Sequence, residues 1–326
     1  MGVFIGALLA CLLSAAVTWM VLRSATRLRI IDHPDEERRL HRVATPRSGG
    51  LGIALVLLLV VLVSPPEASP QGWLLPVAVL AIAGVGMLDD LRALRALPKL
   101  VGQLLGVSLV ALSMPWPAPE PWVGIVIAAV VVLAFVNVWN FMDGSDGMAA
   151  VQALLLSLCL AALGSGVWAW ALVGACVGFL PFNVPKARIF LGDVGSHALG
   201  LGLAILMLSA LGESRVALPS VLLLVSAFLL DSGWTLLLRL VRREPFWKAH
   251  SKHLYQRLIR SGLSHASVCI IYACWTSAAV AACWASQDLT STLQWALVML
   301  FYGSGSILYF MMIGRRPPAP GAGSPE

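Results

Sequence analysis

Long apolar runs follow one another along almost the whole chain and are separated by short polar segments. A helix that crosses a hydrocarbon core of roughly 30 Å needs about 17 to 25 mostly apolar residues. The pattern predicts eleven membrane-spanning helices, at 2–22, 48–64, 73–88, 99–114, 121–140, 148–164, 167–183, 195–211, 217–238, 266–285 and 292–313. Some runs are separated only by glycine- or proline-containing breaks, so ten helices is the alternative count. We expect an all-α polytopic membrane protein.

The composition supports this class. Hydrophobic residues make up 59% of the chain and charged residues 12%, and the mean hydropathy is +0.87. Soluble domains carry about a quarter charged residues, so a soluble enzyme is excluded. Arginines follow the first run and no basic residue precedes it, so we expect a retained helix rather than a cleaved signal peptide. We expect one integral membrane domain, 1–313, and a flexible cytoplasmic tail, 314–326.

The positive charges are distributed unevenly between the connecting segments. If the N-terminus lies outside, all of the 22 Lys and Arg residues except Arg215 fall on the cytoplasmic side. This is the positive-inside pattern, and an even number of helices would break it. The net charge of +6 therefore indicates topology and a surface suited to anionic lipid headgroups, with no indication of nucleic-acid binding. The six cysteines lie within predicted spans and show no metal-ligand spacing.

Polar clusters stand at the ends of the apolar runs, and this topology places them all at the cytoplasmic face. The clearest cluster, Asn137-Val-Trp-Asn-Phe-Met-Asp-Gly-Ser-Asp-Gly147, follows the fifth run. Asp89-Asp90 ends the third run, and Asn183 and the segment 190–196, which contains Asp193, join the seventh run to the eighth. Carboxylates next to hydrocarbon are costly. Several of them at one depth suggest a cleft that binds a hard divalent cation through oxygen ligands.

Each cluster also has a simpler interpretation. Asp89-Asp90 could end a helix in water, the segment 143–147 could be a turn, and 192–196 could cap a helix. The Arg and Lys residues of the loop 239–265, Arg242 among them, could be ordinary cytoplasmic charge. Asp231 differs, because it lies about 12 Å from the cytoplasmic end of its helix at about 1.5 Å per residue. An acidic side chain at that depth more often binds a partner group or a cation than it stands without any partner.

Taken in order along the chain, these segments resemble one enzyme family. The similarity is carried by His41-Arg-Val-Ala-Thr-Pro-Arg-Ser-Gly-Gly50, Leu88-Asp-Asp-Leu91 with Lys99 and Gln103, the segment 137–147, Phe182-Asn183, the segment 190–196 and the basic loop around His253. The chain is similar to the polyprenyl-phosphate N-acetylhexosamine-1-phosphate transferases, glycosyltransferase family 4. The family includes enzymes that initiate O-antigen, enterobacterial common antigen and teichoic acid, and the phospho-MurNAc-pentapeptide translocase.

The resemblance implies a reaction and its partners. It implies transfer of an N-acetylhexosamine 1-phosphate from a UDP-sugar to undecaprenyl phosphate, with release of UMP, as the first membrane step of O-antigen or other cell-surface polysaccharide synthesis. The implied cofactor is Mg2+, with Mn2+ as the alternative. The implied location is the bacterial inner membrane, with a periplasmic N-terminus, a cytoplasmic active site and membrane lipids as neighbours. The resemblance leaves homodimerisation open.

The resemblance also implies roles for individual residues. Asp193 is the first choice for a metal ligand, with Asp89 or Asp90 contacting the metal or positioning the lipid phosphate. The implied catalytic residues are Asp89, Asp90, Asp193 and His253. The residues implied in substrate binding are Lys99, Asn137, Asn140, Asp143, Asp146, Asn183, Arg47 and Arg242. A phosphate monoester is largely ionised near neutral pH, so it stays open whether Asp89 acts as a base or only positions the phosphate.

The last loop departs from the family pattern. Many relatives carry Asp-Arg-x-His-hydrophobic-His-His, whereas this chain has His250-Ser-Lys-His253-Leu-Tyr-Gln256 and keeps only His253 in place. Because the resemblance assigns this loop to the sugar and diphosphate, we hypothesise a 6-deoxy sugar such as N-acetylfucosamine or N-acetylquinovosamine, as in O-antigen-initiating members. N-acetylglucosamine is the alternative. The peptidoglycan translocase fits less well, because it typically has ten helices and a triple-histidine loop.

A secondary transporter is the alternative from another class. Transporters carry intramembrane acids near the bilayer midplane, often in repeated halves. Here most acids cluster at one face, no inverted repeat is visible, and only Asp231 fits that expectation. A CDP-alcohol phosphotransferase would need an Asp-Gly-x-x-Ala-Arg motif, and the segment 146–150 lacks the arginine.

Overall fold

The structure, a computed structural model, describes residues 2–28, 30–32, 44–65, 71–114, 118–245 and 250–314. These residues form a two-stranded antiparallel ribbon, β1 (Ile31–Asp32) and β2 (Thr45–Pro46), and a set of helices. The helices are α1 (Gly2–Leu28), α2 (Leu51–Val63), α3 (Leu74–Arg92), α4 (Ala96–Ser113), α5 (Pro121–Phe141), α6 (Met148–Ala162), α7 (Gly166–Asn183), α8 (Gly192–Gly212), α9 (Leu218–Val241), α10 (Leu254–Arg260), α11 (His265–Ala285) and α12 (Ser291–Ile313).

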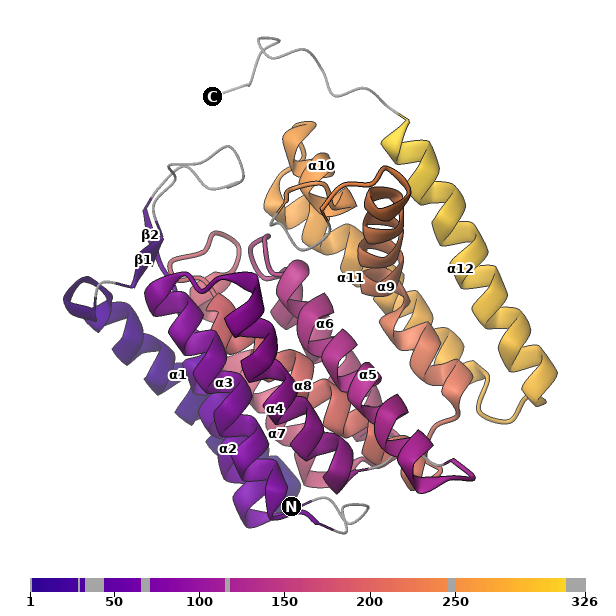
Figure 1. The fold of residues 1–326 in the computed structure, drawn as a ribbon, viewed down its shortest axis with the longest axis horizontal. Coiled ribbons are helices and arrows are strands. Elements are labelled where there is room, and N and C mark those ends of the chain that lie inside the picture. Colours follow the sequence, from indigo (N-terminus) through magenta and orange to yellow (C-terminus); the bar gives the residue numbers. More distant parts are fainter. Residues whose placement is uncertain are drawn as a thin grey trace.

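The predicted all-α polytopic class is confirmed. Each of the eleven apolar runs contains a helix, and nine of the helices in the described residues are long and apolar enough to cross a membrane. Helix α1 begins at the lower end of the molecule and α12 ends at the upper end, as an odd number of crossings requires (Figure 1). Residues 33–43, 246–249 and the tail 315–326, which carry several of the predicted cytoplasmic charges, lie outside the described residues.

Two predicted spans are shorter than expected. The runs 48–64 and 148–164 fold as α2, with 13 residues, and α6, with 15 residues. At 1.5 Å per residue these helices are roughly 20 and 23 Å long, less than a hydrocarbon core of about 30 Å. The ends of both runs leave the helix because they form turns: Ser48 and Gly147 have positive φ before the helices, and Gly164 has a positive φ after α6.

Helix α8 is the centre of the bundle. It packs against α2, α3, α5, α6 and α7, and 89% of the residues in its most apolar stretch are buried. At its start the backbone approaches the turn before α2 closely, and a Cβ on Gly50 would collide with the Cα of Gly195. Glycine at these two positions therefore lets the N-terminus of α8 lie directly beside the segment after β2.

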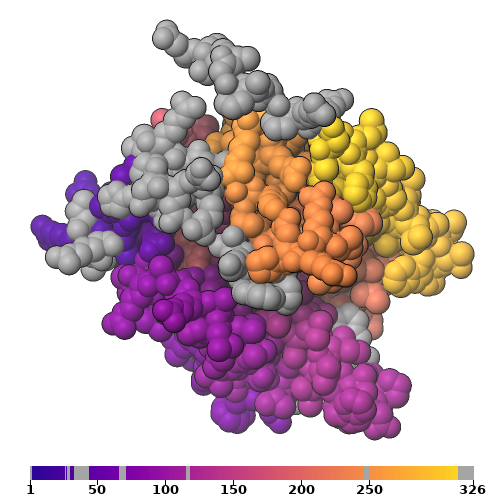
Figure 2. Space-filling model, turned by 45° about the horizontal axis from the view of Figure 1, so that its top comes forward, coloured from indigo at the N-terminus to yellow at the C-terminus, as the bar shows by residue number. Residues whose placement is uncertain are grey.

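Helices α9, α11 and α12 form a second group at one side of the molecule (Figure 1). Helix α9 packs against α5, where the rings of Trp139 and Phe228 lie 5.1 Å apart, and α11 packs against α6. The short helix α10 lies at the upper end with the β-ribbon and the loops that carry the predicted polar clusters (Figure 1). Figure 2 shows this face, with α10 and the start of α11 beside the end of α12. Neither α10 nor the ribbon was predicted from the sequence.

Candidate active site

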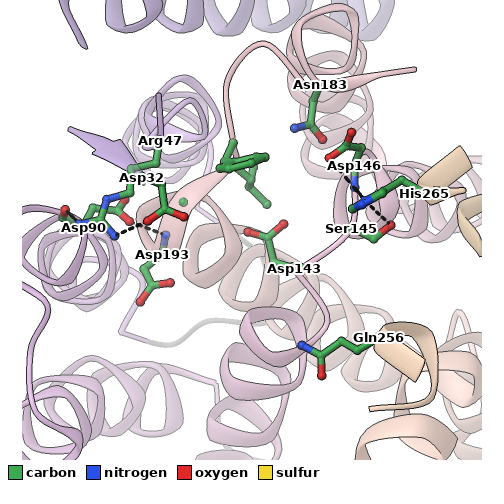
Figure 3. A pocket seen from close by; sticks show the side chains of 14 residues that line it. Asp32, Arg47, Asp90, Asp143, Ser145, Asp146, Asn183, Asp193, Gln256 and His265 are labelled. Carbon is green, nitrogen blue, oxygen red and sulfur yellow. Dashed lines mark hydrogen bonds and ion pairs between the residues drawn. The ribbon is translucent and has the colours of Figure 1, made fainter. Parts of the chain in front are cut away.

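A polar cavity of about 230 Å³ opens at the end of the bundle where the polar clusters meet (Figure 3). Its walls come from β1, the segments after β2, α5 and α7, the end of α3, and the starts of α8, α10 and α11. The lining residues are Asp32, Arg47, Asp90, Asp143, Gly144, Ser145, Asp146, Asn183, Phe190, Leu191, Gly192, Asp193, Gln256 and His265. Five aspartates and one arginine are among them, so the wall is acidic overall.

Asp90 connects the end of α3 to the start of α8. Its carboxylate accepts hydrogen bonds from the backbone N–H of Asp193 at 3.0 Å and of Val194 at 3.3 Å, and from the Ser48 hydroxyl at 2.8 Å. The first N–H groups of a helix lack partners within it, so Asp90 caps α8 from another helix. Gly192 has φ 76°, and a Cβ there would lie 2.5 Å from the Asp90 carboxylate. The contacts of Asp90 are those of a positioning residue.

Lys99, in the first turn of α4, gathers the acidic side chains of two other helices. Its ammonium lies 2.7 Å from the Asp89 carboxylate and 2.5 Å from the Asp193 carboxylate. The second Asp193 oxygen accepts from the Asn140 amide at 2.8 Å, and the second Asp89 oxygen accepts from the Leu94 backbone at 2.6 Å. Asp193 lines the cavity, whereas Lys99, Asp89 and Asn140 stand behind it.

The segment between α5 and α6 forms the opposite wall, and its shape is held by side-chain contacts to the backbone. The buried Asn183 amide accepts from the Gly147 backbone at 2.6 Å and donates to the Ile189 carbonyl at 2.9 Å. Asp146 accepts from the Ala187 backbone at 3.1 Å. The predicted Asn183 and Asp146 therefore line the cavity, and each also ties two loops together.

Asp143 extends into the cavity between these two walls (Figure 3). No hydrogen bond to its carboxylate is found within the described part of the chain. Loss of water contact raises its pKa well above the ordinary value, and the nearby carboxylates of Asp193, Asp90 and Asp146 raise that pKa further. An acid whose charge is opposed in this way favours a cationic partner.

Arg47 supplies the positive charge of the cavity wall. It donates to the backbone carbonyl of Asp90 and lies 4.0 Å from the Asp32 carboxylate of β1. Its Nε is buried and has no hydrogen-bond partner in the described residues. The β-ribbon thus brings Arg47 to the edge of the cavity, where its guanidinium can contact an anion.

Helix α10 is held in place by Asp231, a buried acid in α9. The Asp231 carboxylate accepts from the backbone N–H of Leu254 at 2.7 Å and of Tyr255 at 3.1 Å, and from the Tyr272 hydroxyl at 2.6 Å. Asp231 therefore serves a protein partner, one of the two roles expected from its depth. Tyr255 is buried beneath the 143–147 segment and donates to the Phe141 carbonyl at 3.1 Å, and a Cβ on Gly144 would collide with its hydroxyl.

Not every predicted site residue reaches the cavity. His253 is buried, and its Nδ1 faces Asp231 at 3.5 Å. Arg242 is exposed at the end of α9 and is not part of the wall. Asn137 lies deeper, where its amide donates to Gln103 at 3.2 Å, and the Gln103 amide contacts His197 at 3.1 Å. These three predicted residues do not line the cavity in this structure, and their roles stay predictions.

Four lining residues with polar side chains were missed as site residues by the sequence prediction: Asp32, Ser145, Gln256 and His265. Gln256 was noted only as a departure from the family pattern. His265 follows Ser264, a helix-capping residue, at the start of a predicted span. A histidine at that position, on the same side as the acidic clusters, was the available signal.

The oxygen donors of the cavity fit a hard divalent cation. The Asp143 carboxylate has no hydrogen-bond partner in the described residues, and Asp193 lies on the facing wall. Within those residues no three His, Cys, Asp or Glu side chains already converge on one point. Mg2+ commonly binds through one or two carboxylates and keeps several waters, so Asp143 and Asp193 could hold it without further ligands.

Comparisons with known proteins identify the family. The model of glycosyl transferase family 4 matches residues 73–211. The chain is 33% identical over 317 residues to the decaprenyl-phosphate N-acetylglucosaminephosphotransferase of Mycobacterium tuberculosis, covering 82% of this chain and 78% of the relative. It is 29% identical to a probable undecaprenyl-phosphate N-acetylglucosaminyl 1-phosphate transferase of Bacillus subtilis, covering 78% and 77%. It is 35% identical to the phospho-N-acetylmuramoyl-pentapeptide-transferase of Desulforudis audaxviator, covering 51% and 63%.

The family match includes most of the segments that build the cavity. The family match extends from just before α3 to the end of α8 and thus contains Asp90, Asp143, Asp146, Asn183 and Asp193. The chain also has the membrane-spanning helices expected of an enzyme that acts on a lipid carrier. This chain therefore belongs to glycosyl transferase family 4, the polyprenyl-phosphate sugar-1-phosphate transferases.

Proposed function

We propose that this enzyme transfers an N-acetylhexosamine 1-phosphate from a UDP-sugar to undecaprenyl phosphate and releases UMP. The observation that carries the proposal is the cavity at the helix ends, whose wall combines acidic residues with Arg47 and neutral hydrogen-bonding groups. The names of the Mycobacterium tuberculosis and Bacillus subtilis relatives, which contain a polyprenyl phosphate and N-acetylglucosamine, support the substrate class. We place this step at the start of synthesis of a cell-surface polysaccharide such as O-antigen.

The cation that we propose for this cavity is Mg2+, with Mn2+ as the alternative. The nucleoside diphosphate part of a UDP-sugar is an anion, and a wall with five aspartates and one arginine would repel it. When bound, the cation would supply the positive charge that offsets the diphosphate. Asp143 and Asp193 are its proposed ligands.

The residues of the chain then position two anionic reactants. A phosphate oxygen of the lipid forms a new bond to the phosphorus that carries the sugar, and the bond from that phosphorus to the leaving UMP breaks. Lys99 lies behind Asp193, where it fixes that carboxylate together with Asn140. Arg47 is placed to contact a phosphate oxygen. Asp89 is engaged by Lys99 and by the Leu94 backbone, which favours a positioning role over that of a base.

We propose that the cavity faces the cytoplasm and that the N-terminus lies outside. Arg92, Arg95, Lys186 and Arg188 belong to the segments at the cavity end of the bundle, whereas Arg215 follows α8 at the opposite end. This charge distribution follows the positive-inside rule. The supply of cytosolic UDP-sugars also requires this orientation.

Two kinds of sugar are candidates for the substrate: N-acetylglucosamine and a 6-deoxy N-acetylhexosamine. N-acetylglucosamine appears in the names of relatives that align over most of the chain. The 6-deoxy alternative is supported by the departure at Tyr255 and Gln256, and the structure places Gln256 in the cavity wall. Membranes containing the protein, Mg2+ and undecaprenyl phosphate should be assayed with radiolabelled UDP-N-acetylglucosamine and both 6-deoxy UDP-sugars. A clear preference for UDP-N-acetylglucosamine would exclude the 6-deoxy hypothesis.

The same assay tests the site. We expect Asp193→Asn and Asp89→Asn each to abolish the lipid-linked product and the release of UMP, while the protein remains in the membrane. Glu213→Gln is the matched control, because it makes the same type of change at the other end of α8. Near-normal turnover in both aspartate variants would contradict the site assignment, and no product from any UDP-sugar would contradict the proposed function.

A further inference from the structure

His265 is the first residue of α11 and lines the cavity beside Ser145 and Asp146 (Figure 3). The Ser264 hydroxyl accepts from the Ser267 backbone at 3.0 Å, so the start of α11 is fixed by a helix cap. The position of the His265 ring is therefore set by a helix rather than by a free loop.

The contacts of His265 determine where its proton lies. Its Nδ1 accepts a hydrogen bond from the Asp146 backbone N–H at 3.2 Å, and the Ser145 hydroxyl lies 3.3 Å from the same nitrogen. The Asp146 carboxylate lies 3.6 Å from Nδ1, which is beyond hydrogen-bond distance. A backbone N–H can only donate, so Nδ1 must carry a lone pair. A neutral imidazole with a lone pair on Nδ1 has its proton on Nε2. His265 is thereby held as a donor through Nε2.

This donor is available to a ligand. Within the described residues Nε2 makes no hydrogen bond, and the side chain is 24% exposed. The neighbouring polar groups of this wall are engaged: Asn183 uses both amide atoms on backbone groups, and Asp146 accepts from Ala187. His265 therefore presents an unpaired N–H at the cavity, on the wall away from Arg47 and Asp90 (Figure 3).

We propose that His265 is a substrate-binding residue that donates its Nε2–H to an uncharged oxygen of the nucleotide sugar. The inference rests on the proposed function, because that function supplies the ligand. A neutral imidazole suits a carbonyl or hydroxyl oxygen, whereas the guanidinium of Arg47 suits a phosphate oxygen. Through Nδ1 the same ring holds the backbone of Asp146, so ligand contact at His265 also stabilises the 143–147 segment beside it.

Two substitutions separate ligand binding from support of the loop. In His265→Asn the side-chain carbonyl can replace Nδ1 as acceptor for the Asp146 N–H, while the donor toward the cavity is lost. In His265→Ala both contacts are lost. Ser264→Ala is the control, because it weakens the cap of α11 and leaves both ring nitrogens in place.

The expected result is a split between binding and turnover. A neutral hydrogen bond of ordinary strength corresponds to an increase of about three- to tenfold in KM for the UDP-sugar in His265→Asn. The kcat should stay near the wild-type value, because a contact made equally in the ground and transition states affects KM alone. The Tm of His265→Asn should match the wild type, whereas that of His265→Ala should fall.

Binding of UMP and of the UDP-sugar to purified, monodisperse protein with Mg2+ locates the accepting oxygen. Equal weakening of both ligands in His265→Asn assigns the oxygen to the nucleotide, and weakening of the UDP-sugar alone assigns it to the sugar. Wild-type KM and wild-type affinity for both ligands in His265→Asn would overturn the inference and leave His265 as a loop support. That result is distinct from failure of the proposed function, in which the wild-type enzyme forms no lipid-linked product.

Discussion

The ammonium nitrogen of Lys99 lies 2.5 Å from the carboxylate of Asp193, across the interface between α4 and α8. The same nitrogen lies 2.7 Å from Asp89 of α3. Three helices are thus joined by one positive charge behind the cavity wall. Without it the two carboxylates would repel each other in a partly buried position, where such repulsion is strong.

We expect Lys99→Met to lower turnover by about a hundredfold or more, because removal of one partner leaves buried carboxylates without compensation. Lys99→Arg should not restore full activity, since a planar guanidinium cannot take the place of the compact ammonium. Lys252→Met is the matched control, because Lys252 pairs with Glu244 on the exposed surface. Initial rates of lipid-product formation measure the effect, and retention of more than half of the activity in Lys99→Met would contradict it.

Asp90→Asn should destabilise the fold as well as reduce activity. The carboxylate now accepts hydrogen bonds from backbone N–H groups of α8, and the amide nitrogen of asparagine, itself a donor, would face one of these groups. An unsatisfied buried polar group costs about 1–3 kcal/mol in the free energy of unfolding, so we expect a lower Tm in detergent. Ser48→Ala removes a single donor to the same carboxylate and should have a smaller effect. Equal Tm values for wild type and Asp90→Asn would refute the capping role.

Mg2+ should stabilise the wild-type protein by opposing the mutual repulsion around Asp143. At a concentration about 100 times the Kd, a ligand adds about 2.7 kcal/mol to the free energy of unfolding. The raised pKa of Asp143 means that its charged form is disfavoured in the folded state. Asp143→Asn should therefore raise the Tm in EDTA and reduce the further gain on addition of Mg2+. A Mg2+-dependent gain that is unchanged in this variant would exclude Asp143 as a ligand.

Acid should destabilise the protein through His250. Burial, together with His253, Arg239 and Lys252, lowers the pKa of His250 to about 4 from its ordinary 6.5. The folded state therefore resists protonation of His250, so its contribution is fully present above pH 6.5 and is lost as the pH falls toward 4. His250→Gln should show a smaller loss of Tm between pH 7 and 4.5. Parallel Tm curves for the two proteins would contradict this prediction.

Asp231→Asn should release α10 from α9. The carboxylate accepts from the first backbone N–H groups of α10 and from Tyr272, and an amide in its place would turn its own N–H groups toward some of these donors. A buried polar group left unsatisfied in this way typically costs about 1–3 kcal/mol in the free energy of unfolding. Activity should fall with stability, because α10 carries Gln256 into the cavity wall. Thr235→Val is the control, since Thr235 contributes one weaker contact to Asp231 at 3.2 Å. Hydrogen exchange at the backbone amides of Leu254 and Tyr255 measures the release, because Asp231 protects these amides in the wild type. Unchanged protection in Asp231→Asn would contradict the prediction.

The eleven helices could be predicted from the sequence because hydropathy alone marks a segment that must satisfy its backbone inside lipid. The prediction of helix ends and of short elements was less accurate, because turns and tertiary contacts determine them. Turns shortened α2 and α6, and α10 has only 7 residues, so its formation depends on Asp231 rather than on a periodic pattern. Each strand of the β-ribbon has only two residues, which is too short for an alternating pattern to mark in the sequence.

The convergence of Asp90, Asp143, Asp146, Asn183 and Asp193 on one cavity followed from placing helix ends on one side of a membrane. The direction of each side chain could not be obtained in that way. His253 was expected in the site, yet it faces Asp231, because the start of α10 turns its ring toward α9. His265 was missed because its role depends on the Asp146 backbone, which lies far away in the sequence.

The contact between Gly144 and Tyr255 has a consequence for engineering. The Tyr255 hydroxyl occupies the space that a side chain at 144 would need, and the two residues belong to segments that sequence comparison treats as independent motifs. A histidine-type loop grafted from a relative would leave this space empty, whereas a bulkier residue at 144 would displace Tyr255. Any exchange of the loop that carries Tyr255 between relatives therefore has to be made together with the segment that carries Gly144.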